Sequence, residues 1–257
     1  MKIGFFDSGI GGLTVLSEAI KRLPNHEYLY YADTLHAPYG PKPKEEVRGY
    51  VFEAIEFLVQ QGAQIIVIAC NTATSIAIEE LRTKYSIPII GMEPAVKPAI
   101  HLKDEMKKRV LVTATPLTLK EEKLHRLIQQ LDAEHITDLL PLPGLVRFAE
   151  AFDFSDTTVI PYLREQLAFF NVKEYKAVVL GCTHFPFFSK QFKQLFPEGI
   201  TLIDGSVGTV THLEKMIVKM QNDTQNELKV TFFKSGCLVT DEVELKNFTR
   251  LIDRLMK

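Results

Sequence analysis

Two short stretches, one in each half of the chain, limit most strongly what this sequence can fold into. Residues 65–74 read IIVIACNTAT, and residues 177–184 read AVVLGCTH. In each stretch, four apolar residues run into a small residue, a cysteine and hydrogen-bonding side chains. This pattern predicts a buried strand that carries a thiol at its carboxyl end. Because ligands bind at that end of open parallel sheets, we expect the two thiols to face each other across one substrate.

The rest of the chain alternates strands and helices in a similar way in both halves. Strands are predicted at residues 2–6, 28–31, 87–90, 109–113, 201–203 and 228–234, and helices at residues 43–61, 119–131, 156–170, 206–220 and 241–256. Thr72 or Thr74 is expected to cap the helix after the first thiol strand, and one helix is expected to follow His184 up to Phe196. Two prolines within residues 91–98 indicate a crossover between the halves. The sequence therefore predicts an α/β fold with two similar α/β domains and mainly parallel sheets.

Composition excludes several classes of protein. The chain has 257 residues, of which 46% are hydrophobic and 24% are charged, as in a globular protein of one large or two modest domains. Its net charge of −2 and the lack of interleaved basic and aromatic residues argue against a nucleic-acid partner. No apolar run approaches the roughly 18 residues that cross a bilayer, so we expect no membrane association and a cytoplasmic protein. Three cysteines, an odd number, favour reduced thiols over a disulfide framework.

Each half combines one thiol with one side chain that can exchange a proton. Asp7, at the end of the first predicted strand, could orient Cys70 or accept its proton. His184, two residues after Cys182, could do the same for the second thiol. A helix N-terminus stabilises the thiolate form that proton transfer requires. Neutral groups that could bind a carboxylate without competing for the proton follow the thiols at Asn71, Thr72 and Thr183.

Plainer interpretations exist for some of these residues. Cysteine usually packs as a small apolar residue, and this is the expectation for Cys237. A zinc site formed by Cys70, Cys182 and His184 is conceivable, but no CxxC pair or HExxH motif accompanies it, so no metal is expected. On local evidence, His36 and Glu150 are typical of solvated or loop residues.

Five motifs together resemble those of the bacterial glutamate racemases. They are DSGIGG at residues 7–12, ADT at 32–34 with PYG at 38–40, ACNTAT at 69–74, GCTH at 181–184 followed by Pro186, and LID at 202–204. They occur in the order of the family and span nearly the whole chain. The resemblance implies cofactor-independent interconversion of L- and D-glutamate, an isomerase reaction that feeds D-glutamate to peptidoglycan. It also implies a first α/β domain of residues 1–95 and 207–257, a second of residues 96–206, and an active site in the cleft between them.

The resemblance also assigns roles to individual residues. Cys70 and Cys182 match the two acid/base thiols, Asp7 and His184 match their assisting groups, and Glu150 matches an acidic residue near the second thiol. The substrate-contacting positions of the family match Ser8, Pro38, Tyr39, Gly40, Asn71, Thr72, Thr118 and Thr183. Glutamate is the expected small-molecule partner, with a homodimer left open.

Inversion at an α-carbon explains why two thiols are useful. A base must remove the proton on one face while an acid supplies one on the other, and a single residue cannot easily reach both faces. Two alternatives stay open at this point. The chain could act on aspartate or another amino acid, or it could be a non-catalytic amino-acid-binding or regulatory protein.

Overall fold

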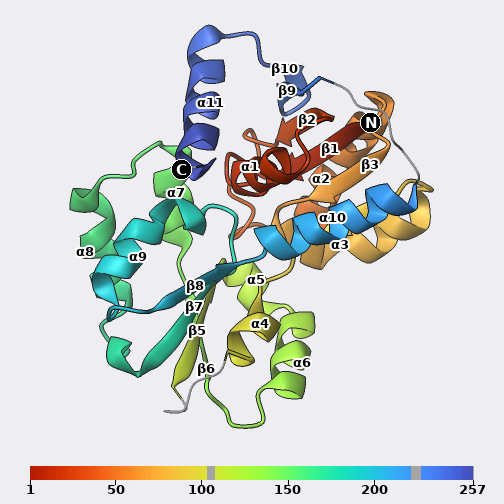
Figure 1. Cartoon of the computed structure of the whole chain (residues 1–257). Coiled ribbons are helices and arrows are strands. Elements are labelled where there is room, and N and C mark those ends of the chain that lie inside the picture. The colour runs from red at the N-terminus through yellow and green to blue at the C-terminus, as the bar shows by residue number, and fades with distance from the viewer. Residues whose placement is uncertain (103–107, 221–226, 257) are drawn as a thin grey trace. The chain divides into compact units, whose positions relative to one another are not determined.

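The computed structural model describes residues 1–102, 108–220 and 227–256. The chain separates into two compact units, and most of their helices and strands are labelled in Figure 1. One unit joins Met1–Met92 to Ser206–Lys257, and the other is the continuous segment Glu93–Gly205. The first unit is therefore discontinuous in sequence, whereas the second is inserted into it.

A mainly parallel sheet forms the centre of the first unit. Within the described residues it has six strands, which are β1 (Lys2–Asp7), β2 (Glu27–Ala32), β3 (Ile65–Ile68), β4 (Ile89–Gly91), β9 (Lys229–Lys234) and β10 (Cys237–Leu238). Their order is β10-β9-β2-β1-β3-β4, and only β10 runs antiparallel to its neighbour. The C-terminal segment thus extends the sheet by pairing β9 with β2.

Helices cover both faces of this sheet. They are α1 (Leu13–Arg22), α2 (Lys44–Gln60), α3 (Asn71–Lys84), α10 (Ser206–Lys219) and α11 (Glu242–Met256). Helix α1 packs against α10 and α11, and α2 packs against α3. Because crossovers between parallel strands are right-handed, α1 lies on one face and α2 and α3 lie on the other. The buried residues of α2 recur at helical spacing, at Val47, Val51, Ala54, Ile55 and Leu58.

The second unit is built on a smaller, fully parallel sheet. In the part of this unit that the structure describes, the strands are β5 (Arg109–Ala114), β6 (Thr137–Pro141), β7 (Tyr175–Leu180) and β8 (Thr201–Asp204), in the order β6-β5-β7-β8. The helices around it are α4 (Val96–Ile100), α5 (Pro116–Lys120), α6 (Glu122–Leu131), α7 (Pro143–Glu150), α8 (Asp156–Gln166) and α9 (Ser189–Leu195), with short 3-10 turns η1 (Val172–Glu174) and η2 (Phe185–Phe188). Its apolar core joins β5 and β7 to α4, through Val110, Val112, Ala177, Val179 and Val96.

Both sheets place their first four strands in the same order. The chain moves from the first strand to a neighbour on one side, and then crosses to the other side for the third and fourth. The crossovers therefore diverge between β1 and β3 in one sheet and between β5 and β7 in the other. Such switch points are where open α/β sheets bind ligands, at the carboxyl ends of the strands. The predicted α/β class with mainly parallel sheets is confirmed.

Some predicted elements differ in detail. Helix α4 begins within the crossover predicted at residues 91–98. Pro98 is tolerated there because it lies in the first turn of α4, where its missing N–H breaks no helical hydrogen bond. The helix predicted at residues 119–131 is divided into α5 and α6, because Glu121 is extended with ψ of 127°. The helix predicted between His184 and Phe196 is instead η2 followed by α9.

The cap of α3 is also a correction. Thr72 and Thr74 lie inside the helix, and the capping residue is Cys70 itself. Cys70 has an extended backbone, with φ of −67° and ψ of 116°, and its sulfur accepts a hydrogen bond from the N–H of Ala73. The residue expected to act in chemistry therefore also starts the helix.

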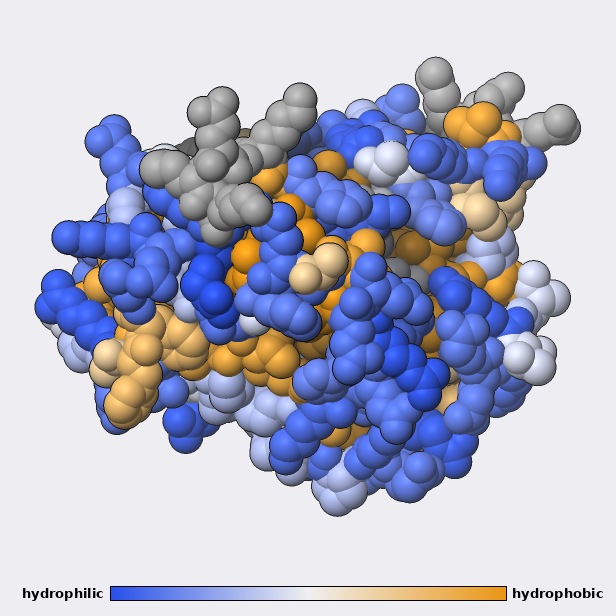
Figure 2. All heavy atoms as spheres, turned by 90° about the horizontal axis from the view of Figure 1, so that it is seen from below, coloured by the Kyte–Doolittle hydropathy of each residue, from blue (hydrophilic) through white to orange (hydrophobic). Residues whose placement is uncertain are grey.

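Hydrophilic residues cover most of the face drawn in Figure 2, and apolar residues show there in smaller areas. No helix in the described ranges combines the length and apolar character needed to cross a bilayer. Cys237, expected to pack as a small apolar residue, is exposed. It belongs to β10, a strand of two residues at the edge of the sheet, which leaves it little to pack against.

Candidate active site

The first thiol lies at the switch point of the six-stranded sheet. Cys70 is 5% exposed, and its thiol donates to Ser8 Oγ over 3.6 Å. The Ala73 N–H donates to its sulfur over 3.5 Å. The N-terminus of a helix carries partial positive charge and favours an anionic group. The connection from β3 to α3 therefore holds a buried thiol where a thiolate is stabilised.

Asp7 reaches the same edge of the sheet from the neighbouring strand. It ends β1, which lies beside β3, and the Ala69 N–H donates to Phe6 O over 2.8 Å where the two strands end. Asp7 is fully buried, and its Oδ1 accepts a hydrogen bond of 2.9 Å from the N–H of Gly9. A Cβ at Gly12 would lie 2.6 Å from Asp7 Cβ, so glycine lets α1 begin against this carboxylate. The DSGIGG motif thus encloses Asp7 next to the first thiol.

The loop at residues 33–41 brings an aromatic side chain to this edge. Tyr39 is 2% exposed, and its hydroxyl donates to Asp33 Oδ2 over 2.6 Å. Burial raises the pKa of Tyr39 far above its usual range, and the negative charge of Asp33 and its hydrogen bond to the Tyr39 hydroxyl raise it further. Tyr39 therefore remains a neutral hydrogen-bonding group, flanked by the half-buried Pro38 and Gly40.

Asn71 is the clearest candidate for contact with a ligand in the first unit. It is the first residue of α3 and is 4% exposed. Neither its Oδ1 nor its Nδ2 finds a hydrogen-bond partner among the described residues. Buried amides are nearly always hydrogen-bonded, so both atoms are available to a polar ligand. Thr72, the next residue, is 2% exposed.

The second thiol follows the end of β7. The N–H of Gly181 donates to Thr113 O over 2.7 Å, and a Cβ at Gly181 would lie 2.6 Å from that oxygen. Only glycine permits this approach of β7 to β5. Cys182 comes next in the chain and is 7% exposed. The glycine of the GCTH motif therefore fixes where the second thiol leaves the sheet.

A histidine and a carboxylate stand in line behind this thiol. Cys182 Sγ lies 3.6 Å from His184 Nδ1, and His184 Nε2 lies 2.6 Å from Glu150 Oε1. Thr183 Oγ1 is 3.4 Å from the same Nδ1. Glu150, the partner of His184, is the last residue of α7 and lies 34 residues before the histidine in the sequence. The local interpretation of Glu150 as a solvated residue is therefore wrong.

The charges around His184 determine its protonation. Burial alone would lower the pKa of His184, but the hydrogen bonds to Cys182 and Glu150 outweigh burial and raise that pKa well above its usual value. When protonated, the ring can donate one N–H toward Cys182 and the other to the Glu150 carboxylate. This arrangement suits a thiol that gives up a proton and takes it back.

Thr118 occupies the neighbouring strand end. It lies in α5, which follows β5, and is 2% exposed. Its N–H donates to Thr115 Oγ1 over 3.2 Å, and the Thr115 hydroxyl donates to Thr118 Oγ1 over 3.0 Å. Because β5 and β7 are adjacent and parallel, Thr118 and Cys182 lie at the same edge of the second sheet.

The structure adds one residue that the sequence does not single out. Asp33 is 2% exposed and directly follows β2, where it holds the hydroxyl of Tyr39. Its position immediately after a buried strand, within the ADT motif, is the sequence signal that could have identified it.

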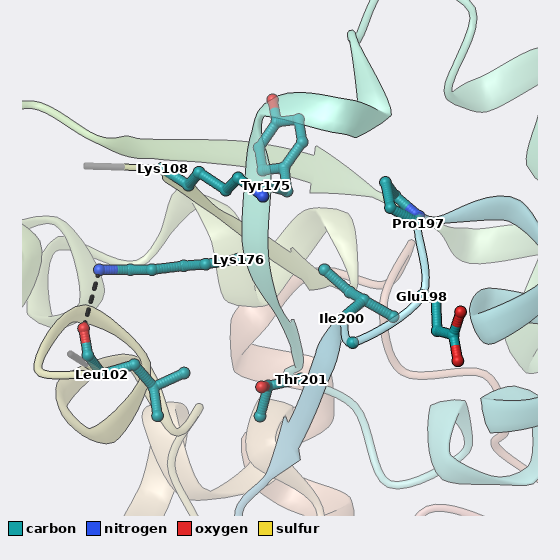
Figure 3. Close-up of a pocket in the computed structure, with 9 residues that line it drawn as sticks. Leu102, Lys108, Tyr175, Lys176, Pro197, Glu198, Ile200 and Thr201 are labelled. Carbon is teal, nitrogen blue, oxygen red and sulfur yellow. Dashed lines mark hydrogen bonds between the residues drawn. The ribbon is translucent and has the colours of Figure 1, made fainter. Parts of the chain in front are cut away.

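A cavity of about 230 Å³ lies in the second unit (Figure 3). Its lining includes Tyr175, Lys176 and Thr201, which begin β7 and β8, whereas Cys182 follows the opposite end of β7. Lys176 Nζ donates to Leu102 O over 3.1 Å, as Figure 3 shows. Nowhere in the described residues do three or more His, Cys, Asp or Glu side chains gather as a metal site.

Comparison with known proteins gives one consistent family. The model of the Asp/Glu/Hydantoin racemase family matches residues 13–213. Glutamate racemase 2 of Bacillus subtilis (strain 168) is 53% identical over 255 residues, covering 99% of this chain and 96% of that protein. The glutamate racemase of Halothermothrix orenii is 48% identical over 257 residues, covering 99% of this chain and all of the relative.

Solved structures agree with these sequences. The crystal structure of Escherichia coli glutamate racemase, in complex with L-glutamate and the activator UDP-MurNAc-ala, is similar with a TM-score of 0.85 and 28% identity, covering 99% of this chain and 94% of that one. The crystal structure of Francisella tularensis glutamate racemase, in complex with D-glutamate, is similar with a TM-score of 0.80 and 26% identity. The match covers 98% of this chain and 93% of that one. The resemblance expected from the motifs is thereby confirmed, and the chain belongs to the Asp/Glu/Hydantoin racemase family.

Proposed function

We propose that this protein interconverts L- and D-glutamate without a cofactor, using Cys70 and Cys182 as its two proton-transferring groups. The observation that carries this proposal is the matching position of the two thiols. Each is buried at the switch point of a parallel sheet, with Asp7 at the same sheet edge as Cys70 and His184 next to Cys182. The relatives with 48–53% identity over nearly their whole length support glutamate as the substrate.

The reaction consists of two proton transfers at one carbon atom. One cysteine, as a thiolate, removes the proton from the α-carbon, and the electron pair of the broken C–H bond stays on that carbon. The other cysteine, as a thiol, then donates its proton to the opposite face of the carbon. The product has inverted configuration, and the two cysteines have exchanged protonation states, so the reverse reaction starts from the state that the forward reaction leaves.

Helper groups make these transfers reversible at neutral pH. The imidazolium of His184, anchored by Glu150, stabilises negative charge on Cys182 and can return a proton to it. On the other side, the capping geometry of α3 stabilises negative charge on Cys70. Asp7 would orient or deprotonate that thiol.

The carbanion is the difficult species. Its formation requires hydrogen-bond donors that are already in place and a site that excludes water. The unpaired amide of Asn71 and the hydroxyls of Ser8, Thr72 and Thr183 are buried groups that could hold the substrate, together with Thr118, Pro38, Tyr39 and Gly40. We propose that these groups enclose the substrate and exclude water from it.

The biological setting is part of the same proposal. D-glutamate formed in the cytoplasm would supply peptidoglycan synthesis. Sedimentation analysis of the purified protein would show whether it forms a homodimer.

The decisive experiment is chiral analysis of glutamate and aspartate incubated with the purified protein. After exhaustive dialysis against a chelator and a carbonyl-trapping reagent, we expect either enantiomer of glutamate to become a racemic mixture, with kcat/KM well above that for aspartate. Comparable values for both amino acids would contradict the substrate assignment. Activity that returns only with zinc or pyridoxal phosphate would contradict the cofactor-independent mechanism.

A further inference from the structure

We propose that Asp33 and Ser235 are positioning residues that fix the loop at residues 33–41 to the C-terminal hairpin formed by β9 and β10. We call the paired carboxylate and hydroxyl the Asp33–Ser235 clamp. Its effect on catalysis rests on the proposed function, because the loop carries Tyr39 and its neighbours, which are proposed to contact glutamate.

The sheet brings the two residues together. Strands β2 and β9 are parallel, and Ala32 pairs with Lys234 at their carboxyl ends. The next residues are therefore side by side, and the Ser235 N–H donates to Ala32 O over 2.9 Å. The Ser235 hydroxyl donates to Asp33 Oδ1 over 2.9 Å and accepts a hydrogen bond of 3.1 Å from the N–H of Leu35. One hydroxyl thus holds both the carboxylate and the backbone of the loop.

Asp33 also forms hydrogen bonds to two other side chains of the loop. Besides the Ser235 hydroxyl, its carboxylate is 2.6 Å from the Tyr39 hydroxyl and 2.8 Å from His36 Nδ1. The His36 ring stacks on Tyr50 of α2, with centroids 3.7 Å apart and planes at 12°. A buried carboxylate needs such partners, and each partner is fixed in return.

The same residue is connected to the proposed chemistry through the backbone. The Asp33 N–H donates to Asp7 O over 3.0 Å, so the loop begins beside the helper of the first thiol. Leu35, which the clamp also holds, is 79% exposed and contributes little packing of its own. The hydrogen bonds of the clamp, rather than apolar contacts, therefore hold this part of the loop.

The backbone of Ser235 indicates that its hydroxyl has a specific role. Ser235 and Gly236 form the two-residue turn of the hairpin, with φ of 43° and 84°. Turns with two positive φ values favour glycine, asparagine or aspartate at both positions. Serine is strained there, and it offers what glycine lacks, which is the hydroxyl that bonds to Asp33.

Ser235→Gly tests the clamp because it removes the hydroxyl while relaxing the backbone. We expect the KM for glutamate to rise at least about threefold with kcat within about twofold, because the loop would contribute less to binding. We also expect faster amide hydrogen exchange across residues 33–40, with a melting temperature equal to or above that of the wild type. A purely structural role for Ser235 would change stability without moving KM.

Gly236→Ala is the matched control in the same turn. A Cβ there meets only the Tyr31 hydroxyl, at 4.0 Å, but φ of 84° is unfavourable for alanine. We expect the melting temperature to fall by about 2–4 °C while KM stays at the wild-type value. Stability and substrate binding would then respond to different residues of one turn.

Two results would overturn the clamp. One is wild-type KM together with wild-type exchange in Ser235→Gly, and the other is an equal rise of KM in Gly236→Ala. If the wild-type protein does not racemise glutamate, the proposed function fails. The exchange measurement still decides the clamp in that case, since faster exchange in Ser235→Gly supports it and unchanged exchange refutes it.

Discussion

Each thiol is assigned to one face of the substrate carbon, and replacing the thiols one at a time separates their roles. Serine at neutral pH is too weak a base, so Cys70→Ser and Cys182→Ser should each lower racemisation by more than about 10³-fold. The family resemblance assigns deprotonation of D-glutamate to Cys70 and of L-glutamate to Cys182. A glutamate analogue that eliminates a leaving group after one deprotonation should therefore be processed mainly as its L form by Cys70→Ser and mainly as its D form by Cys182→Ser.

Circular dichroism of both variants would show that they are folded. Near wild-type racemisation by either variant would refute the assignment. Equal loss of elimination from both enantiomers in both folded variants would refute it as well.

The raised pKa of His184 makes a pH-dependent prediction. Because the folded pKa is above the unfolded one, the charged ring contributes stability that is complete below the unfolded pKa and is lost as pH rises through the folded pKa. Glu150→Gln removes a hydrogen bond that raises the pKa of His184, so this loss should be smaller and should be complete at lower pH. Thermal melts across a pH series would measure the change.

The same substitution should lower racemisation equally in both directions, because the equilibrium constant between enantiomers keeps their kcat/KM values equal. We expect kcat/KM for each enantiomer to fall about tenfold, less than the roughly 10²–10⁴ expected for a group that itself transfers the proton. The alkaline limb of its pH profile should move to lower pH. Glu165→Gln, an exposed site on α8, serves as the control and should leave both profiles unchanged. An unshifted alkaline limb in Glu150→Gln would show that Glu150 does not tune His184.

At the scale of elements, the end of β7 depends on a glycine. A Cβ at residue 181 would lie 2.6 Å from the carbonyl oxygen of Thr113, which belongs to the backbone and cannot rotate away. Gly181→Ala should therefore lower the free energy of unfolding by about 1–3 kcal/mol. It should also reduce kcat, because Cys182 is the next residue. Denaturant unfolding and steady-state kinetics would measure the two effects.

Gly208→Ala is the matched control for Gly181→Ala. Gly208 lies in α10 with open space around it, so the same substitution should raise stability by up to about 1 kcal/mol through helix propensity. Its kinetics should remain at wild-type values. A Gly181→Ala variant that is as active and as stable as the wild type would show that the close approach of β7 to β5 is unnecessary.

The thiol strands were predictable because their pattern is local. An apolar run that ends in small and polar residues fixes a buried strand and its exit without knowledge of the fold. The partner of His184 was not predictable in this way, since Glu150 reaches it only through the packing of α7 in the second unit. The same limit applies to Ser235, whose partner Asp33 lies 202 residues away in sequence.

The prediction of some helix boundaries failed for a different reason. Leu124, Leu127, Ile128 and Leu131 recur at helical spacing, but the extended residue Glu121 separates them from Leu119, which lies five residues before Leu124. Thr115 followed by Pro116 was a readable start signal for α5, with the threonine as cap and the proline in the first turn. The capping role of Cys70 carried no comparable signal, because cysteine is not among the preferred capping residues.

For the whole molecule, the two units should differ in their ability to fold alone. The segment 93–205 contains every strand of its own sheet, so the isolated fragment should unfold cooperatively in denaturant. The segment 1–92 lacks β9, α10 and α11, which contribute buried Phe232, Leu213 and Phe248 to the first unit. It should lack cooperative unfolding until residues 206–257 are supplied. A cooperative transition in isolated 1–92 would contradict this dependence.

The discontinuity of the first unit has a consequence for how the protein is made. On the ribosome, β2 emerges early, but β9, the strand that covers its free edge, emerges only after the entire second unit has been translated. During that interval the nascent chain carries an uncovered edge with the sequence EYLYYA, which is rich in the aromatic residues that favour intermolecular strand pairing. Slow translation of the intervening segment would lengthen this exposure, so chaperone capture in the cell should concentrate on chains halted before β9.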